Sequence, residues 1–428
     1  MKNKKETLLI LTILITICII IFNRDKLYEA KYTEPKDTLL AITINGEIST
    51  TFPTTKYYET SVECTTGTGK VEWNGTKWVL TTNGITKGST KCNATFITKV
   101  PTFAETILAN NKVKAPITTP GATISTASEA LLASTEDDYG TSYYFRGAVT
   151  NNYVEFANKC WRIVRVGGDG SVKLILHNDN TAKAANPCAA ANNSASAAFA
   201  HYNGSTYTSR FNENYDDNAY IGFKYGTPGS SKYETTHANT NKSTILTNLE
   251  TWYTNNLKTY ESVIDDTVWC NDKTNVTDTS YDPWSITPNG LGYAKNVTYY
   301  GATKRLVGTS GSAGGTGPSL KCNGELSKIN SKVGLITADE LAFAGYAYNI
   351  GNTTTYLQEN ATNTYWWSLS PYGFDVGSAG VWGVNGSAGY FDNYNVRGTY
   401  GVRPLISLKS TTNVTGEGTS SAPYIISM

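Results

Sequence analysis

The side chains that most often carry out acid–base chemistry are few in this sequence. It contains three histidines, His177, His201 and His237, and no two of them are neighbours. A catalytic triad or a histidine-based metal site needs such side chains to converge, and the spacing of these three does not predict convergence. We therefore expect surface or strand positions for them, and we predict no catalytic residue.

Two other patterns could indicate a phosphate or metal site, and neither is complete. The glycine-rich segment 308–318 lacks the Lys-Ser/Thr of a phosphate loop, so we interpret it as a flexible loop. The acidic clusters at 136–138, 216–217 and 265–266 do not match a calcium loop and are interpreted as solvated turns. The sequence singles out no carboxylate pair for hydrolysis. We expect no metal and no cofactor.

The cysteines favour an exported protein. Apart from Cys18 they form an even set of six without any C-x-x-C spacing, which disfavours zinc. We predict three disulfides in an oxidising compartment. Cys64 and Cys92 are the best pair, because they enclose one compact β segment. The other four pair, by sequence order alone, as Cys160–Cys188 and Cys270–Cys322.

Composition agrees with a β-rich extracellular protein. Charged residues make up 17% of the 428 residues and the net charge is +1, so the electrostatic signature of a nucleic-acid-binding protein is missing. Aromatics reach 12%, with 29 Tyr and 9 Trp. Such residues favour strands. We expect no nucleic-acid partner.

The N-terminus predicts attachment to a membrane. An apolar run at 8–22 follows three lysines, and no small-residue cleavage site comes after it. We favour an uncleaved signal-anchor that crosses the cell membrane once and leaves the C-terminal domain outside. A cleaved signal peptide is the alternative.

Turn residues and changes in composition along the chain predict several segments and domains. Asn74-Gly75, between Trp73 and Trp78, predicts a two-residue hairpin turn in a small all-β module. The expected order is a transmembrane segment at 1–22, a stalk at 23–38, the disulfide-stapled module at 39–100, a short helix and linker at 101–136, and a main domain at 137–428 with a surface insertion near 178–241.

Two helices are predicted in the main domain, which favours an α+β fold class with mixed antiparallel sheets. Thr337 with Glu340 predicts a capping box at the start of the second helix. The segments 381–384 and 400–408 read as closing strands, with Pro404 at an edge or bulge. Arg403 needs a buried partner, for which Glu340 or Asp339 is the candidate. The first helix lies within 243–260, where helical spacing relates Ile245, Leu249, Trp252, Tyr253 and Leu257.

The closing strands carry a family resemblance. "WWSLSP" at 366–371, "VWGVNGSAGYF" at 381–391 and "YGVRPLISL" at 400–408 resemble the end of the C-type-lectin-like fold, as found in formylglycine-generating-enzyme-like domains and retroelement-diversified variable proteins. "GLITADELAFAGY" at 334–346 and "GEGTSSAPYII" at 416–426 resemble segments of related bacterial exported surface proteins. The resemblance covers roughly 137–428 and leaves the insertion unmatched.

The resemblance implies structural roles for some residues and display roles for others. Trp366, Trp367, Trp382, Glu340 and Arg403 are expected to be structural, and Val384, Phe391 and Val402 join the core. The intervening Tyr, Asn, Asp and Gly residues match the composition of recognition loops. The expected ligand-binding residues are Tyr372, Phe374, Asp375, Asn385, Tyr390, Asp392, Asn393, Tyr394, Asn395 and Arg397.

Departures from the family narrow the expected function. No cysteine follows Cys322, whereas the enzymes use a redox pair there, and the Glu-Pro-Asn, Gln-Pro-Asp and Trp-Asn-Asp motifs of calcium-dependent lectins do not occur. We therefore expect a membrane-anchored adhesion protein, not an enzyme, that binds a protein or glycan without calcium. The alternatives are a structural envelope protein and, less favoured, an enzyme of this fold. A further alternative is that 372–397 is a Gly/Asn-rich loop without a specific binding role.

Overall fold

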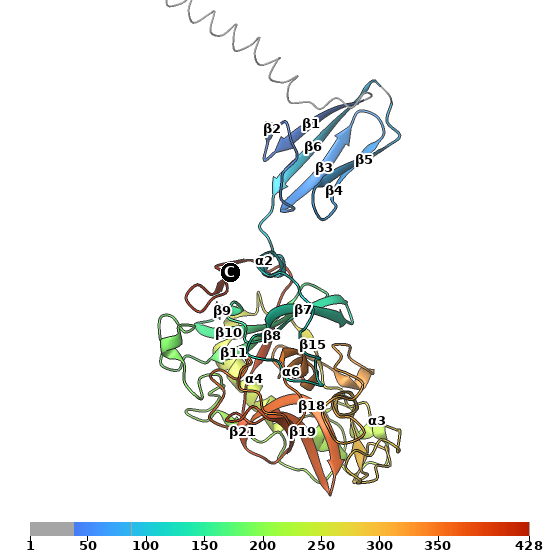
Figure 1. Cartoon of the computed structure of the whole chain (residues 1–428), viewed down its shortest axis with the longest axis vertical. Helices are drawn as coiled ribbons and strands as arrows, with labels where there is room; N and C mark the ends of the chain where they lie inside the picture. Colours follow the sequence, from blue (N-terminus) through green and yellow to red (C-terminus); the bar gives the residue numbers. More distant parts are fainter. Residues whose placement is uncertain (1–37, 87, 428) are drawn as a thin grey trace, which may run out of the picture. The chain divides into compact units, whose positions relative to one another are not determined.

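A computed structural model describes residues 38–86 and 88–427 of the chain (Figure 1). The chain divides into two compact units between Pro101 and Thr102. Strands make up 36% of the structure and helices 13%. This balance follows from a chain rich in tyrosine and tryptophan, which pack well on pleated surfaces.

The first unit is a four-stranded sheet with a separate hairpin. The sheet order is β2-β1-β6-β3, with β1 and β6 parallel, and β4 pairs with β5. Cys64 and Cys92 lie opposite each other on β3 and β6 and form a disulfide, which confirms the predicted pair. The strands are β1 (Thr38–Ile44), β2 (Glu47–Ser49), β3 (Tyr58–Cys64), β4 (Thr68–Trp73), β5 (Trp78–Asn83) and β6 (Thr90–Thr98).

The turn of the β4–β5 hairpin is longer than the predicted two residues. Trp73 and Trp78 are paired, so four residues, 74–77, connect the strands. The Asn74 carboxamide oxygen accepts hydrogen bonds from the backbone N–H groups of Thr76 and Lys77, at 3.1 and 3.0 Å. This side-chain bonding stabilises a wider turn than the Asn-Gly dipeptide alone predicts.

Two sheets form the framework of the second unit. The eight-stranded sheet contains β7 (Ala130–Asp137), β8 (Gly140–Gly147), β9 (Tyr153–Phe156), β10 (Lys159–Val166), β11 (Val172–Asn178), β22 (Leu405–Leu408), β23 (Val414–Thr415) and β24 (Tyr424–Ile426). The six-stranded sheet contains β12 (Thr208–Ser209), β16 (Thr298–Tyr299), β18 (Trp366–Asp375), β19 (Ser378–Val384), β20 (Phe391–Asn395) and β21 (Tyr400–Gly401). Two small ladders pair β13 (Lys224–Tyr225) with β14 (Asn241–Lys242) and β15 (Thr267–Cys270) with β17 (Lys328–Ser331).

Short helices accompany these sheets, and α6 packs against strands of both (Figure 1). The α4 helix buries Ile245, Leu249, Trp252 and Tyr253 as its spacing predicted. Both halves of the Thr337–Glu340 capping box are present at α6. The helices are α2 (Phe103–Asn110), α3 (Tyr233–Thr236), α4 (Thr244–Asn256), α5 (Gly301–Leu306) and α6 (Ala338–Ala344).

The predicted fold class requires correction, although a broad α+β description remains compatible. Strands dominate, and the described residues contain five α-helices, none longer than 13 residues, in place of two main helices. No helix in the described part of the chain is long and apolar enough to cross a membrane. The predicted transmembrane segment at 1–22 and the stalk at 23–38 lie outside the described residues, except for Thr38.

The segment 101–136, expected as a short helix and linker, belongs to the second unit from Thr102 onward. It contains α2, whose Phe103 packs edge-on against Tyr424 with ring centroids 5.2 Å apart. A second capping box, Thr102 with Glu105, starts this helix. The N- and C-terminal segments of the unit are therefore packed together.

Arg403 lies where the chain passes from the six-stranded sheet to the eight-stranded sheet. The prediction that a carboxylate pairs with Arg403 is wrong. The predicted strand 400–408 is broken between β21 and β22. Arg403 is fully buried, donates from Nε to the Leu176 carbonyl at 2.9 Å and from Nη1 to the Leu357 carbonyl, and lies over the Trp366 ring. Main-chain carbonyls replace the expected ion pair because Glu340 contacts Arg165 and Lys173 instead.

Candidate functional site

The ten predicted ligand-binding residues fall into three groups by exposure. Tyr372 and Phe374 are buried. Tyr390, Asn395 and Arg397 are exposed. The remaining residues are half-buried: Asp375, Asn385, Asp392, Asn393 and Tyr394.

Tyr372 and Phe374 belong to the core, so the prediction that they lie on a binding surface is wrong. Every residue of β18 from Trp366 to Phe374 is buried, so side chains on both faces of the strand are covered. The Tyr372 ring packs against Trp382 and Trp284, with ring centroids 5.4 Å apart in each case. The side chains of Tyr372 and Phe374 therefore stabilise the packing of the sheet and are not accessible to a ligand.

Three tyrosines from separate segments of the chain form an aromatic surface. Tyr365 precedes β18, Tyr394 lies on β20 and Tyr400 lies on β21. Their ring centroids are 5.0 Å apart for Tyr365–Tyr394, 5.2 Å for Tyr365–Tyr400 and 5.4 Å for Tyr394–Tyr400. Tyr365 is 37% exposed and the other two are half-buried. We call Tyr365, Tyr394 and Tyr400 the tyrosine surface.

Gly383 on β19 provides the space in which Tyr394 lies. A Cβ atom at position 383 would meet the Tyr394 ring at 2.9 Å and the Trp366 carbonyl oxygen at 2.8 Å. Both distances are shorter than van der Waals contact allows. The glycine in "VWGV" is therefore part of the construction of the tyrosine surface.

Replacing Gly383 by alanine is expected to displace Tyr394 and to destabilise the protein by about 1–3 kcal/mol through overpacking. Gly380→Ala, on the same strand, is the matched control, because its Cβ would meet neighbours only at 3.5 Å or more. Urea denaturation of both variants measures the difference. Equal stability of the two variants would show that Tyr394 does not depend on Gly383.

A second feature is a polar pocket of about 290 Å³ formed after β11. Its polar lining includes Asn178, Asn180, Asn192, Ser194, Ser196 and His201. The Cys160–Cys188 disulfide, which is confirmed, fixes the loop that carries these residues to β10. We call this cavity the polar pocket.

Asp179 holds His201 in one orientation at the edge of the polar pocket. The Asp179 Oδ2 atom accepts from the His201 backbone N–H at 2.9 Å and contacts its Nδ1 at 3.1 Å, so Nδ1 carries the proton. Oδ1 accepts from Trp252 and contacts the Lys159 ammonium at 2.8 Å. Burial favours a raised pKa for Asp179, but the bonds to His201 and the charge of Lys159 outweigh it and lower the pKa. The carboxylate therefore stays ionised.

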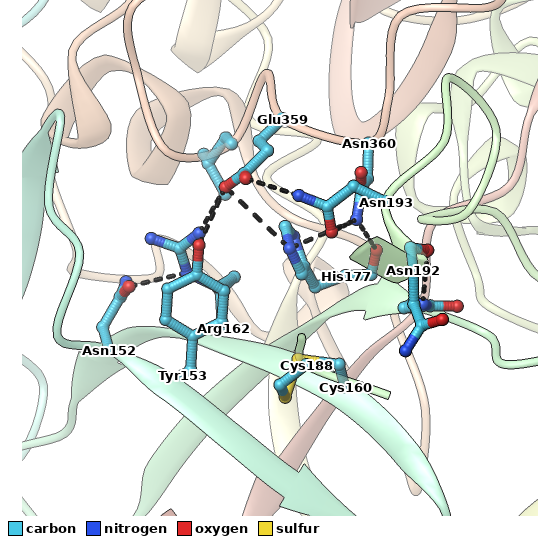
Figure 2. Close-up of polar contacts among 12 residues, drawn as sticks. Asn152, Tyr153, Cys160, Arg162, His177, Cys188, Asn192, Asn193, Glu359 and Asn360 are labelled. Atoms are coloured by element: carbon cyan, nitrogen blue, oxygen red, sulfur yellow. Dashed lines mark hydrogen bonds and ion pairs between the residues drawn. A yellow bond between two sulfur atoms is a disulfide. The ribbon is translucent and has the colours of Figure 1, made fainter. Parts of the chain in front are cut away.

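The wall behind the polar pocket contains a hydrogen-bond network centred on Glu359, shown in Figure 2. Glu359 accepts from Arg162 at 2.9 Å, from Tyr153 at 3.0 Å and from Asn193 at 2.8 Å. His177 lies beside it, and burial together with nearby arginines lowers its pKa well below the usual value. His177 is thus neutral, and the network serves to hold Asn193 in place.

A third feature is a small charged cavity of about 50 Å³, with ion pairs in its walls. Arg165 bonds Asp137 at 2.9 Å and Glu340 at 3.0 Å, while Arg305 bonds Asp339 at 2.7 Å. We call these five residues, with Lys173 and Asp272, the ion-pair cluster. The third confirmed disulfide, Cys270–Cys322, lies along the same cavity. Because its charges are matched with one another, we assign the cluster to stability.

The sequence interpretation missed the polar pocket. Of the three histidines, His177 lies on β11 as expected and His201 is partly exposed, but His237 is buried after α3. The pocket lies within the segment near 178–241 that the sequence predicts to be a surface insertion. This segment shows little periodicity, and its composition gives no signal that distinguishes a pocket from a loop. Within the described residues, no three metal-ligating side chains converge.

Comparison with known proteins finds no matching family, no matching curated protein and no matching solved structure. The resemblance of the closing strands to C-type-lectin-like domains therefore stays a prediction. The function must be argued from the geometry of the site.

Proposed function

We propose that this is an exported binding protein whose tyrosine surface contacts a glycan without calcium. The observation that carries the proposal is the contact of three tyrosine rings from separate segments of the six-stranded sheet and its approach. Rigid aromatic rings provide contact area at small entropic cost, and neighbouring Asn side chains supply adaptable hydrogen bonds. Three disulfides support an oxidising, extracellular setting.

Among the classes of ligand that this surface could bind, a neutral glycan fits better than a charged partner. Arg397, the nearest cation on the segment 372–397, lies over the Tyr215 ring at 3.9 Å and is already engaged. All six cysteines in the described part of the chain form disulfides. They do not supply the reactive thiol that an oxidase would require. We therefore propose binding, not catalysis.

Replacing Tyr394 and Tyr400 together by alanine is expected to weaken glycan binding at least about tenfold, since central aromatic contacts contribute about 2 kcal/mol or more. Binding is measured on a glycan array and by titration calorimetry, with calcium and with EDTA. Tyr139→Ala is the matched control, because Tyr139 is 62% exposed in the β7–β8 turn, outside this surface.

A thermal melt separates loss of binding from loss of folding. The proposal expects unchanged glycan affinity for Tyr139→Ala. The double variant should melt cooperatively at a lower temperature, because both rings also pack against the core, and its binding is measured well below that melt. Full binding by the double variant would contradict it, and binding abolished by EDTA would show that calcium is required.

A further inference from the structure

The polar pocket and the tyrosine surface are joined by a continuous series of contacts. The His201 ring meets the Tyr207 ring with centroids 5.2 Å apart, and the Tyr207 hydroxyl accepts from Asn363 Nδ2 at 2.6 Å. Asn363 lies two residues before Tyr365, the first member of the tyrosine surface. Tyr207 is half-exposed and stacks on the buried Phe199 ring. A path of polar and aromatic groups therefore leads from the pocket to Tyr365.

The backbone fixes this path. The N–H groups of Thr362 and Asn363 both donate to the Ala195 carbonyl at 2.9 Å, and Ala195 lies between two pocket-lining serines. The β12–β21 pairing places Thr208 opposite Gly401, next to Tyr400. The pocket wall and the tyrosine surface are thus held in one rigid arrangement by main-chain hydrogen bonds.

The chemistry of the polar pocket suits a hydroxyl-rich neutral group. The Lys159 and Asp179 charges neutralise each other at 2.8 Å. With its Nδ1 proton directed to Asp179, His201 has an acceptor at Nε2 that has no hydrogen-bond partner among the described residues. The hydroxyls of Ser194 and Ser196 supply further donors and acceptors. The amide groups of Asn178, Asn180 and Asn192 donate to main-chain carbonyls within the wall and fix its shape. The volume of about 290 Å³ is at the small end of ligand pockets, which fits one sugar residue.

We propose that the polar pocket is the end subsite of an extended glycan site and receives the terminal sugar of a neutral oligosaccharide. The following sugars lie over Tyr207 and the tyrosine surface. This inference rests on the proposed function and adds to it the class of ligand, a neutral chain with a free end, and the direction in which it lies.

The test uses cellotetraose, maltotetraose and N-acetylchitotetraose as probes, together with glucose and N-acetylglucosamine. Ser196→Trp fills the pocket with an indole ring, and Ser196→Ala is the matched control that leaves the space open. Tetrasaccharide affinity is measured by calorimetry, and monosaccharide binding by saturation-transfer NMR. A thermal melt of each variant checks its folding.

Variants of the polar pocket and of the tyrosine surface are expected to give different results. Ser196→Trp loses monosaccharide binding and weakens tetrasaccharide binding at least about tenfold, or about 1.4 kcal/mol, whereas Ser196→Ala binds as the wild type does. The Tyr394/Tyr400 double variant weakens only tetrasaccharide binding and keeps the monosaccharide signal.

Each contrary outcome identifies what has failed. Wild-type affinity in a folded Ser196→Trp variant, with binding lost in the tyrosine variant, overturns the end subsite and leaves the proposed function intact. Binding lost in Ser196→Trp but unchanged in the tyrosine variant overturns the tyrosine surface as the binding site. A wild-type protein that binds none of the probes overturns the neutral-glycan assignment for both regions.

Discussion

Replacing Glu340 by glutamine is expected to lower the free energy of unfolding by about 3–5 kcal/mol, the usual cost of breaking a buried ion pair. Glu340 is buried at the start of α6 and contacts Arg165 at 3.0 Å and Lys173 at 3.3 Å. Glutamine keeps the shape and can still accept from the Thr337 backbone N–H. The substitution therefore removes the charge and leaves the capping geometry.

Loss of Glu340 is costly because its cationic partners are also buried. Burial lowers the pKa of Lys173 to about 8, even though Glu340 attracts its proton. Without the carboxylate, Lys173 loses its only ion-pair partner among the described residues. Glu325→Gln is the matched control, since Glu325 pairs with Lys328 on the surface and its side chain is 90% exposed. We expect unchanged stability for that control.

The pH dependence of stability provides a separate signature. Burial favours a raised pKa for Glu340, but Lys173, Arg165 and the Thr337 N–H outweigh it and lower the pKa from 4.5 to about 2. The carboxylate thus stabilises the fold fully above pH 4.5 and loses this contribution, about 3 kcal/mol, as the pH falls toward 2. Urea denaturation at several pH values should show a shallower acid slope for Glu340→Gln. An acid slope equal to that of the wild type would contradict this assignment.

Removing the Cys64–Cys92 disulfide by serine substitution is expected to unfold the first unit and leave the second folded. The disulfide closes a loop with a sequence separation of 28, which corresponds to about 3.5 kcal/mol in the chain-entropy model. Each unit has its own hydrophobic core. That of the first is small, with these buried hydrophobic residues in the described part of the unit: Leu40, Ile42, Val71, Trp78, Cys92, Ala94 and Phe96. A core of this size leaves little stability in reserve.

Limited proteolysis with mass spectrometry and differential scanning calorimetry measure the effect. The double variant should be cleaved within 38–101 and should lose one thermal transition. Glu63→Ser with Asn93→Ser is the matched control, because this exposed pair lies next to the cysteines in the same register without a covalent link. An unchanged melting profile in the cysteine variant would show that the module does not need its disulfide.

Local patterns in the sequence were sufficient to predict features whose interacting residues lie close together in the chain. The capping box at Thr337 and Glu340 spans three residues, and the α4 helix follows from its own apolar spacing. The Cys64–Cys92 pair also depends on one compact segment. In these cases the partners are close in the chain, so a short window contains the relevant physics.

The sequence could not predict features that depend on partners far apart in the chain. Residues on both faces of β18 are buried, so Tyr372 packs against Trp284 and Trp382, which are distant in the chain or on another strand. Arg403 is satisfied by the carbonyls of Leu176 and Leu357, which no residue type reveals. The polar pocket requires His201 to meet Asp179 across an irregular segment without periodicity. Only the folded structure brings such groups together.

The order in which the strands of the eight-stranded sheet are synthesised affects how the protein folds as it is made. The last strands of the chain complete it: β22 pairs with β11, and β24 pairs in parallel with β9. In a chain that emerges from its N-terminus first, β9 and β11 keep unpaired edges until residues 405–426 have appeared. Open edges invite pairing with other chains, and such long-range pairing forms slowly. Synthesis of this protein therefore includes an interval in which a chaperone or rapid completion must protect those edges.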